Sequence, residues 1–301
     1  MPVPLIDLSA GTAAQQAREV DAALRSAGFF GIVGHGVPAA VVAAAFDAGH
    51  RFFALPQADK ERWHIDRWPL RRGFDPIGWQ ALDAGAPPDL KESFYLGVET
   101  IGPNQWPDET LLPGFRAACD AYADAMLQLA RRLMGLFEMA LDLPPGALER
   151  FHRRPTCTTR VLHYPPQPAL AEPGQIGCGA HTDWGALTLL AQDDAGGLQV
   201  HTGGESGDWL DIPPQAGAFV VNVGDMMPRW TNDRWRSTMH RVINRLSGRE
   251  RWSIAYFYDL DADASIAPLP TCTSATNPPR YAPITAGEHL EAMYRQTTVR
   301  A

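Results

Sequence analysis

The stretch GAHTDWGALTLL, residues 179–190, places a histidine and an aspartate two positions apart, directly before a run that is typical of a buried strand. In an extended segment, residues i and i+2 point to the same side. The imidazole of His181 and the carboxylate of Asp183 can therefore reach one metal ion, while Thr182 faces away. The alternative is a polar turn, because a His-x-Asp pattern is common by itself.

A third ligand is available in the segment STMHRV, residues 237–242, where His240 begins another strand-like run. Two histidines and one carboxylate form the ligand set of non-haem Fe(II) oxygenases, which leaves three metal positions open for substrate and oxygen. His181, Asp183 and His240 are therefore our candidate metal ligands.

A basic residue in an apolar strand gives the second line of evidence. In RWSIAYFYD, residues 251–259, strand alternation places Arg251, Ser253, Ala255, Phe257 and Asp259 on one face. A buried guanidinium is costly unless it is paired. Together with the Ser253 hydroxyl it forms a cradle for a carboxylate ligand. An ion pair with an internal Asp or Glu is the alternative, but it leaves Ser253 unexplained.

Composition excludes several classes of partner. The chain of 301 residues is 45% hydrophobic and has a net charge of −8, which argues against nucleic-acid binding and against docking to anionic membranes. The start of the chain lacks the pattern of a signal peptide, and the longest apolar run, residues 37–46, is too short to span a bilayer. Four scattered cysteines are typical of reduced thiols, so we expect a cytoplasmic protein. The expected partner is a small-molecule substrate.

The pattern along the chain predicts one folding unit, residues 1–301, that is mainly β with flanking helices. Residues 1–150 are expected to form a helix-rich portion that packs on the core, with a long amphipathic helix over 114–141. Short β-rich runs separated by turns over 151–265 predict an antiparallel sandwich or barrel. A loop and a final helix are expected over 266–301.

With these pieces in place, the sequence resembles the isopenicillin N synthase-like branch of the Fe(II)/2-oxoglutarate-dependent dioxygenases. The resemblance extends over essentially the whole chain. Besides HTD, His240 and RWS, it is carried by PLIDLS (4–9), GFFGIVGHGV (28–37), RRGFDPIGW (71–79), DLKESFYLG (89–97), LHYPPQP (162–168), GLQV (197–200), FVVNVGDMM (219–227), WTN (230–232) and NPPRYAPIT (277–285).

The resemblance implies a double-stranded β-helix, or jelly roll, and a specific site. His181, Asp183 and His240 would bind Fe(II), and Arg251 with Ser253 would bind the distal carboxylate of 2-oxoglutarate, helped by the phenol of Tyr164. O2 would then be consumed with release of succinate and CO2, and the substrate would be hydroxylated, desaturated or cyclised. Plant relatives often carry Asn at the position of Leu162, so contacts to the oxo-acid end of the cosubstrate can differ here.

Substrate contacts are expected from two regions. Phe257 and Asp259 follow Arg251 on the same strand face, and Met227 and Trp230 follow the GDMM turn. A loop-rich segment, residues 68–113, could cover the mouth of the site and contains Arg72, Phe74 and Trp79. For most of these residues ordinary core packing is the alternative. His163 points away from Tyr164 by strand alternation and is a poor ligand candidate.

Other functions remain open from the sequence. One is an oxidase of the same fold that does not use 2-oxoglutarate, or an ethylene-forming variant. Another is a jelly-roll binding protein without catalysis, which the complete set of five site residues disfavours. A zinc hydrolase would need a general base that is not evident and would leave Arg251 and Ser253 without a role. Neither the substrate nor the oligomeric state can be predicted from the sequence.

Overall fold

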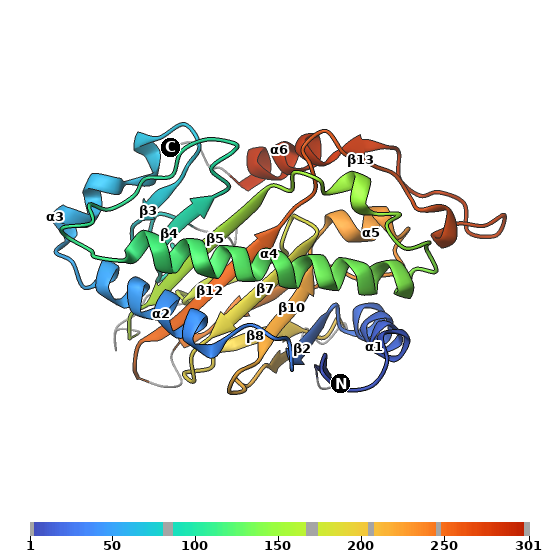
Figure 1. The fold of residues 1–301 in the computed structure, drawn as a ribbon, viewed down its shortest axis with the longest axis horizontal. Helices are drawn as coiled ribbons and strands as arrows, with labels where there is room; N and C mark the ends of the chain where they lie inside the picture. The colour runs from blue at the N-terminus through green and yellow to red at the C-terminus, as the bar shows by residue number, and fades with distance from the viewer. Residues whose placement is uncertain (1–2, 81–86, 167–173, 204–207, 245–247, 298–301) are drawn as a thin grey trace.

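An eight-stranded sheet forms one wall of the protein (Figure 1). The computed structural model describes residues 3–80, 87–166, 174–203, 208–244 and 248–297. All neighbouring strands of this sheet are antiparallel except the first pair, which is parallel. In spatial order the strands are β1 (Leu5–Asp7), β2 (Phe29–Val33), β10 (Phe219–Val223), β7 (Leu187–Gln192), β12 (Arg251–Tyr258), β5 (Cys157–Tyr164), β4 (Glu92–Gly97) and β3 (Gly73–Asp75).

A smaller antiparallel sheet forms the opposite wall. Its order is β6 (Cys178–His181), β11 (His240–Val242), β8 (Leu198–His201) and β9 (Trp209–Asp211). Buried side chains from both sheets meet in one cluster, which includes Leu162, Ala255, Val200 and Val242. We call the side of the large sheet that contributes to this cluster its inner face. Two sheets around a shared apolar interior confirm the predicted jelly-roll core.

Helices cover the outer face of the large sheet. The helix α4 (Phe115–Ala140) runs across it in Figure 1 and packs against α1 (Ala13–Ser26) and α2 (Ala39–Phe53). Its buried residues recur three and four positions apart, which gives the helix one continuous apolar side. They include Cys119, Tyr122, Met126, Leu129 and Leu133. The predicted helix over 114–141 is confirmed.

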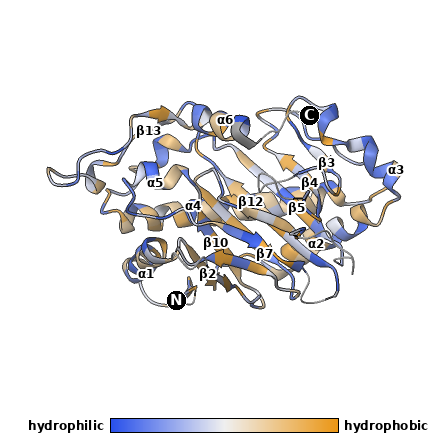
Figure 2. Cartoon of the chain, turned by 180° about the vertical axis from the view of Figure 1, so that it is seen from behind, coloured by the Kyte–Doolittle hydropathy of each residue, from blue (hydrophilic) through white to orange (hydrophobic). Residues whose placement is uncertain are grey.

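The remaining elements are short and lie at the rim. They are α3 (Gln57–Lys60), α5 (Met226–Trp230), α6 (Ala286–Thr297), the pair β13 (Ser265–Ile266) and β14 (Ile284–Thr285), and 3₁₀ turns at Glu61–Trp63, Ile65–Arg67, Glu149–Phe151 and Pro270–Cys272. Hydrophobic residues recur along the large sheet, whereas α3 is mainly hydrophilic (Figure 2). No helix in the described part of the chain combines the length and apolarity needed to cross a membrane.

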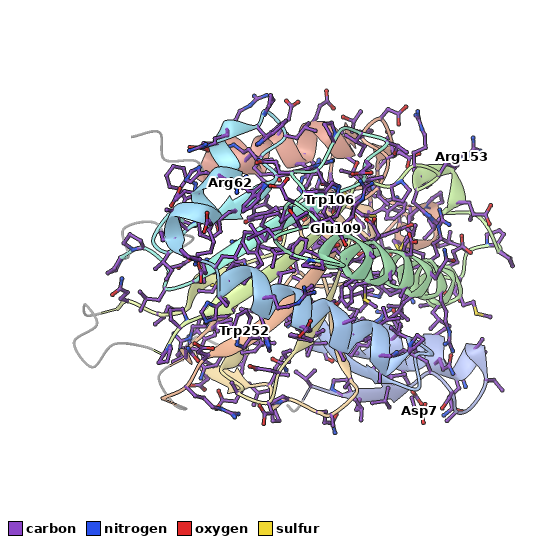
Figure 3. The ribbon with its side chains drawn as sticks, turned by 60° about the vertical axis from the view of Figure 1, so that its left-hand side comes forward. Asp7, Arg62, Trp106, Glu109, Arg153 and Trp252 are labelled. Carbon is purple, nitrogen blue, oxygen red and sulfur yellow. The ribbon has the colours of Figure 1, made fainter. Side chains whose placement is uncertain are left out.

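Strand alternation separates two sets of side chains on β12. Trp252 points to the outer face beside α2 (Figure 3), where it stacks on His163 with ring centroids 4.1 Å apart. His163 Nδ1 also lies 2.8 Å from Glu92 Oε1 on that side. The neighbouring positions Arg251 and Ser253 therefore face the interior, and His163 faces away from it, as the sequence pattern predicts.

The N-terminal portion contributes more than helices. Its strands β1 and β2 extend the large sheet beyond β10, and β3 and β4 extend it beyond β5. Four of the eight strands therefore come from residues before 150. The strands β1 and β2 lie within the stretches PLIDLS (4–9) and GFFGIVGHGV (28–37). The sequence did not predict β6, β9 or α5 as separate elements.

Candidate metal centre and cosubstrate site

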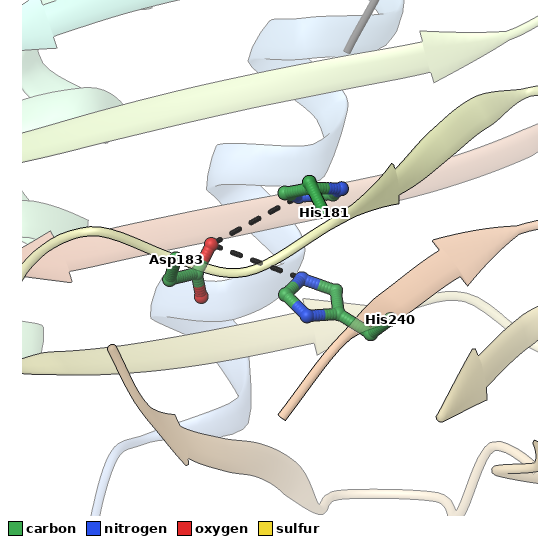
Figure 4. A group of neighbouring side chains, drawn as sticks. All are labelled: His181, Asp183 and His240. Atoms are coloured by element: carbon green, nitrogen blue, oxygen red, sulfur yellow. Dashed lines mark ion pairs between the residues drawn. The ribbon is translucent and has the colours of Figure 1, made fainter. Parts of the chain in front are cut away.

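His181, Asp183 and His240 come together between the two sheets (Figure 4). The strands β6 and β11 pair so that His181 lies directly opposite His240, and the two ring centroids are 4.3 Å apart. Asp183 Oδ1 lies 4.0 Å from His181 Nε2 and 3.8 Å from His240 Nε2. One ligand atom from each residue lies within 4.8 Å of the others, so the three can hold one metal ion.

Backbone carbonyls orient both imidazoles. His181 Nδ1 lies 2.8 Å from Gly179 O, and His240 Nδ1 lies 3.2 Å from Thr238 O. Because a carbonyl oxygen only accepts hydrogen bonds, each Nδ1 carries the proton and each Nε2 presents a lone pair. Burial lowers the pKa of His181 and lowers the pKa of His240 to about 4. Both rings are therefore neutral near pH 7, as metal ligation requires.

Asp183 is held by its second oxygen. Oδ2 accepts hydrogen bonds of 2.6 Å from the Thr188 hydroxyl and of 2.6 Å from the Asn222 amide. Burial by itself raises the pKa of Asp183, but the two imidazoles and these hydrogen bonds outweigh it and the pKa lies below its ordinary value. The carboxylate stays ionised with only Oδ1 directed at the histidines, which leaves room for further ligands on a metal.

Arg251 supplies a buried positive charge on the inner face of β12. It is 1% exposed, and its guanidinium donates to Gly196 O at 2.8 Å, to Ser253 Oγ at 3.1 Å and to Gln192 Oε1 at 3.3 Å. Tyr164 lies opposite Arg251 in the register of β5 and β12, with its ring centre 4.8 Å from the guanidinium carbon.

Within the described residues, Arg251 has no carboxylate counter-ion. Among the residues that the structure describes, no carboxylate forms an ion pair with it. The alternative of an internal Asp or Glu partner therefore finds no support there. A buried cation beside a hydroxyl and a phenol is suited to a bound carboxylate.

The sequence and the fold have extensive relatives. The chain matches the 2OG-Fe(II) oxygenase superfamily over residues 155–260 and the family described as non-haem dioxygenase in morphine synthesis N-terminal over residues 3–109. It is 39% identical over 291 residues to the 2-oxoglutarate-Fe(II) type oxidoreductase hxnY of Emericella nidulans, covering 91% of this chain and 82% of that protein. It is 40% identical over 269 residues to the 2-oxoglutarate-dependent dioxygenase citB of Monascus ruber, covering 83% and 80%.

The chain belongs to the Fe(II)/2-oxoglutarate-dependent dioxygenase superfamily. The crystal structure of a full-length Neurospora crassa protein in complex with alpha-KG agrees, with a TM-score of 0.91 and 29% identity over 98% of this chain and 96% of that one. This dioxygenase therefore uses Fe(II), 2-oxoglutarate and O2. Two neutral imidazoles and one carboxylate fit Fe(II). Arg251, which forms no ion pair within the described part of the chain, fits a dicarboxylate cosubstrate.

Two further buried cations of the dioxygenase lie near this site and were not predicted. Lys91 forms an ion pair with Asp89, whose Oδ1 accepts from Gly179 N at 2.8 Å and so anchors the strand of His181. Arg160, on the inner face of β5, pairs with Asp75 at 3.1 Å. One signal was available: the chain has only two lysines, Lys60 and Lys91, and both form buried ion pairs.

The predicted substrate residues of the dioxygenase divide into two groups. Phe257 packs against the cluster between the sheets, and Asp259 lies under the turn that carries Asp183, where its Oδ1 accepts from Ala186 N at 3.2 Å. Phe257 and Asp259 therefore lie on the inner face of the large sheet, the face that is turned toward His181, Asp183 and His240.

The other group is engaged in packing elsewhere. Arg72 donates to Gly102 O and to Val98 O and so braces the loop after β4. Phe74, Met227 and Trp230 are at most 1% exposed and belong to the core on the outer face of the large sheet. The structure gives these four residues structural roles, and we extend no substrate role to them.

Proposed function

We propose that His181, Asp183 and His240 bind the iron and that Arg251, with Ser253 and Tyr164, binds the distal carboxylate of 2-oxoglutarate. The observation that carries the proposal is that two neutral imidazoles and a carboxylate lie in the same sandwich as a buried guanidinium with which no described carboxylate pairs. When bound, iron and 2-oxoglutarate together supply an oxidant from O2, and succinate and CO2 are released. Hydroxylation of a C–H bond is the reaction we propose, with desaturation and ring closure as variants.

The residues of the chain have separate tasks in this reaction. Arg251 fixes one end of the cosubstrate by charge and hydrogen bonds, while the two imidazoles and Asp183 Oδ1 fix the metal. Thr188 and Asn222 keep Asp183 from turning its second oxygen toward the metal. The buried walls exclude bulk water from the place where the oxidant forms.

We infer that the substrate is a small molecule. The full-length Neurospora crassa protein has also been solved with alpha-KG and thymine, at 29% identity and a TM-score of 0.89, and JOX2 has been solved with JA, at 30% identity and a TM-score of 0.85. Relatives with this fold thus accept chemically different small molecules. A cytoplasmic location is proposed as well, supported by four cysteines that are all free.

The assignment is tested by replacing one ligand and one cosubstrate residue. His181→Ala should lose stoichiometric Fe(II) binding and succinate formation, because two ligands do not hold the metal. Arg251→Met should raise the KM for 2-oxoglutarate on the order of 100-fold, since hydrogen bonds to a charged carboxylate are lost. His201→Ala is the matched control, because His201 lies on β8 and packs edge-on against Trp209 outside the site.

Succinate formed per O2 consumed is the readout that separates the competing functions. Equal amounts support a 2-oxoglutarate-dependent oxygenase. Turnover of O2 without succinate would instead support an oxidase that does not use this cosubstrate. Full iron binding by the His181→Ala variant would refute the metal assignment.

A further inference from the structure

The buried charges of the interior balance once iron and cosubstrate are counted. Lys91 is paired with Asp89 and Arg160 with Asp75. Of the described groups at the site, Asp183 leaves Fe(II) with one net positive charge and Arg251 adds another. The two negative charges of 2-oxoglutarate neutralise that sum. Within the described residues, the buried cations named here are all matched in this way, and none of them is left to receive the carboxylate of a second, anionic molecule.

Asp259 is a buried carboxyl that this balance does not include. It is 9% exposed, and one hydrogen bond to it is seen, from Ala186 N to Oδ1 at 3.2 Å. In the described part of the chain, its Oδ2 has no hydrogen-bond donor and no basic side chain forms an ion pair with it. A buried carboxyl without a partner destabilises a fold, so a ligand that supplies the partner would explain its presence.

The position of Asp259 places it at the substrate end of the site. By strand alternation it shares the inner face of β12 with Ser253 and Phe257, but it lies at the end of the strand opposite to Arg251. It also touches the turn that follows the iron ligand Asp183. A Cβ added to Gly185 would lie 1.5 Å from Asp259 Oδ1, so the absence of a side chain at Gly185 makes room for this carboxyl.

We propose that Asp259 recognises the substrate by accepting a hydrogen bond from an N–H group, and that the substrate is an uncharged or cationic nitrogen compound of the amide, imide or amidine type. This inference rests on the proposed function and specifies the substrate class of the same site. Phe257, two residues earlier on the same face, offers an apolar ring beside the carboxyl. A substrate that presents a carboxylate at this place is repelled, because it meets the carboxylate of Asp259.

Three planar probes of equal size test the proposal. Benzamidine is cationic, benzamide is neutral, and benzoate is anionic. Their dissociation constants are measured by calorimetry, under nitrogen, on the enzyme loaded with Fe(II) and 2-oxoglutarate. The proteins compared are the parent, Asp259→Asn and Asp263→Asn. The last is a matched control, because the same chemical change is made at a carboxylate whose side chain is 80% exposed.

The expected result is that the parent binds benzamidine and benzamide at least ten-fold more tightly than benzoate. Asp259→Asn should reduce the preference for benzamidine over benzoate at least ten-fold, while Asp263→Asn should keep it. Equal binding of benzoate by the parent, failure of all three probes to bind, or an unchanged preference in Asp259→Asn would each contradict the assignment.

A separate measurement keeps this test apart from the proposed function. The parent enzyme is first assayed for succinate formed from 2-oxoglutarate and O2 without any probe. No succinate at all would count against the proposed function itself. Succinate formation together with an unchanged probe preference in Asp259→Asn would count against the role of Asp259 alone.

Discussion

At the scale of single residues, the orientation of Asp183 depends on two donors that are not metal ligands. We predict that Asn222→Ala lowers the affinity for Fe(II) about 10- to 100-fold, because Oδ2 loses one of its two hydrogen bonds and the carboxylate becomes free to rotate. The affinity is measured by anaerobic titration of the protein with Fe(II). Thr188→Val, which removes the other hydrogen bond, should act in the same direction.

Gln199→Ala serves as the control for that titration. Gln199 lies on β8 of the smaller sheet, and its side-chain amide donates a hydrogen bond to Asp211 near the surface. Removing the Gln199 side chain should therefore leave the affinity for Fe(II) unchanged. An unchanged affinity in Asn222→Ala would show that the carboxylate does not need this hydrogen bond.

The residues of the candidate metal site differ in how far the sequence reveals them. The pair His181 and Asp183 follows from local alternation, and His240 and Arg251 each stand out as a polar residue at a strand. Thr188 and Asn222 give no such signal, because they become neighbours only when β7 pairs with β10. Arg160 is hidden for the same reason, since its carboxylate partner Asp75 lies on the edge strand β3.

At the scale of elements, the turn between β6 and β7 fixes Asp183, and Gly224 supports it. A Cβ on Gly224 would lie 2.5 Å from Gly185 O and 2.7 Å from Asp183 O, which are backbone atoms and cannot move aside separately. We predict that Gly224→Ala lowers the free energy of unfolding by about 1–3 kcal/mol and weakens Fe(II) binding, because the whole turn must shift. Urea unfolding and iron titration check the two effects.

Gly135→Ala is the matched control for the turn variant. Gly135 lies within α4, and an added Cβ there would meet no atom within 4 Å. The change should therefore stabilise the protein by about 0.5–1 kcal/mol, since glycine is unfavourable inside a helix. If Gly224→Ala unfolds at the same urea concentration as the parent and binds iron equally well, the turn is not under the restraint described.

Element prediction succeeded where the local pattern is long and failed where it is short. The 26 residues of α4 repeat their apolar side many times, so one misplaced residue does not hide the helix. The strand β6 has four residues, Cys-Gly-Ala-His, of which glycine and alanine have little preference for strands. It exists because β11 pairs with it, which is a tertiary effect that a single segment does not encode.

At the scale of the whole molecule, the large sheet joins the two halves of the chain. The central strands come from residues after 150, while β1 and β2 continue the sheet on one side and β3 and β4 on the other. The pairing of β2 with β10 and of β4 with β5 is long-range, so no single segment of the sequence predicts it. We therefore propose one folding unit, in which the division near residue 150 is a boundary in sequence composition.

The buried carboxyl of Asp259 affects the stability of this whole unit. Burial raises the pKa of Asp259 from its ordinary value of 3.8 to about 7. Well below pH 3.8 the group is protonated in both the folded and the unfolded chain, so its ionisation does not change the free energy of unfolding. As the pH rises toward 7, the unfolded chain releases the proton first, and folding is opposed by up to about 4 kcal/mol above pH 7.

We therefore predict that Asp259→Asn stabilises the metal-free protein and that the gain increases with pH. Asparagine has no proton to release, so its gain over the parent should be about 2 kcal/mol larger near pH 8.5 than near pH 5.5. Chemical unfolding in the presence of a chelator measures it, and Asp263→Asn should show no such trend because its side chain is 80% exposed. A gain that does not depend on pH would mean that Asp259 is already paired in the folded state. A pH-dependent gain, combined with loss of probe selectivity in the same variant, would show that the fold tolerates a destabilising carboxyl because the substrate site needs it.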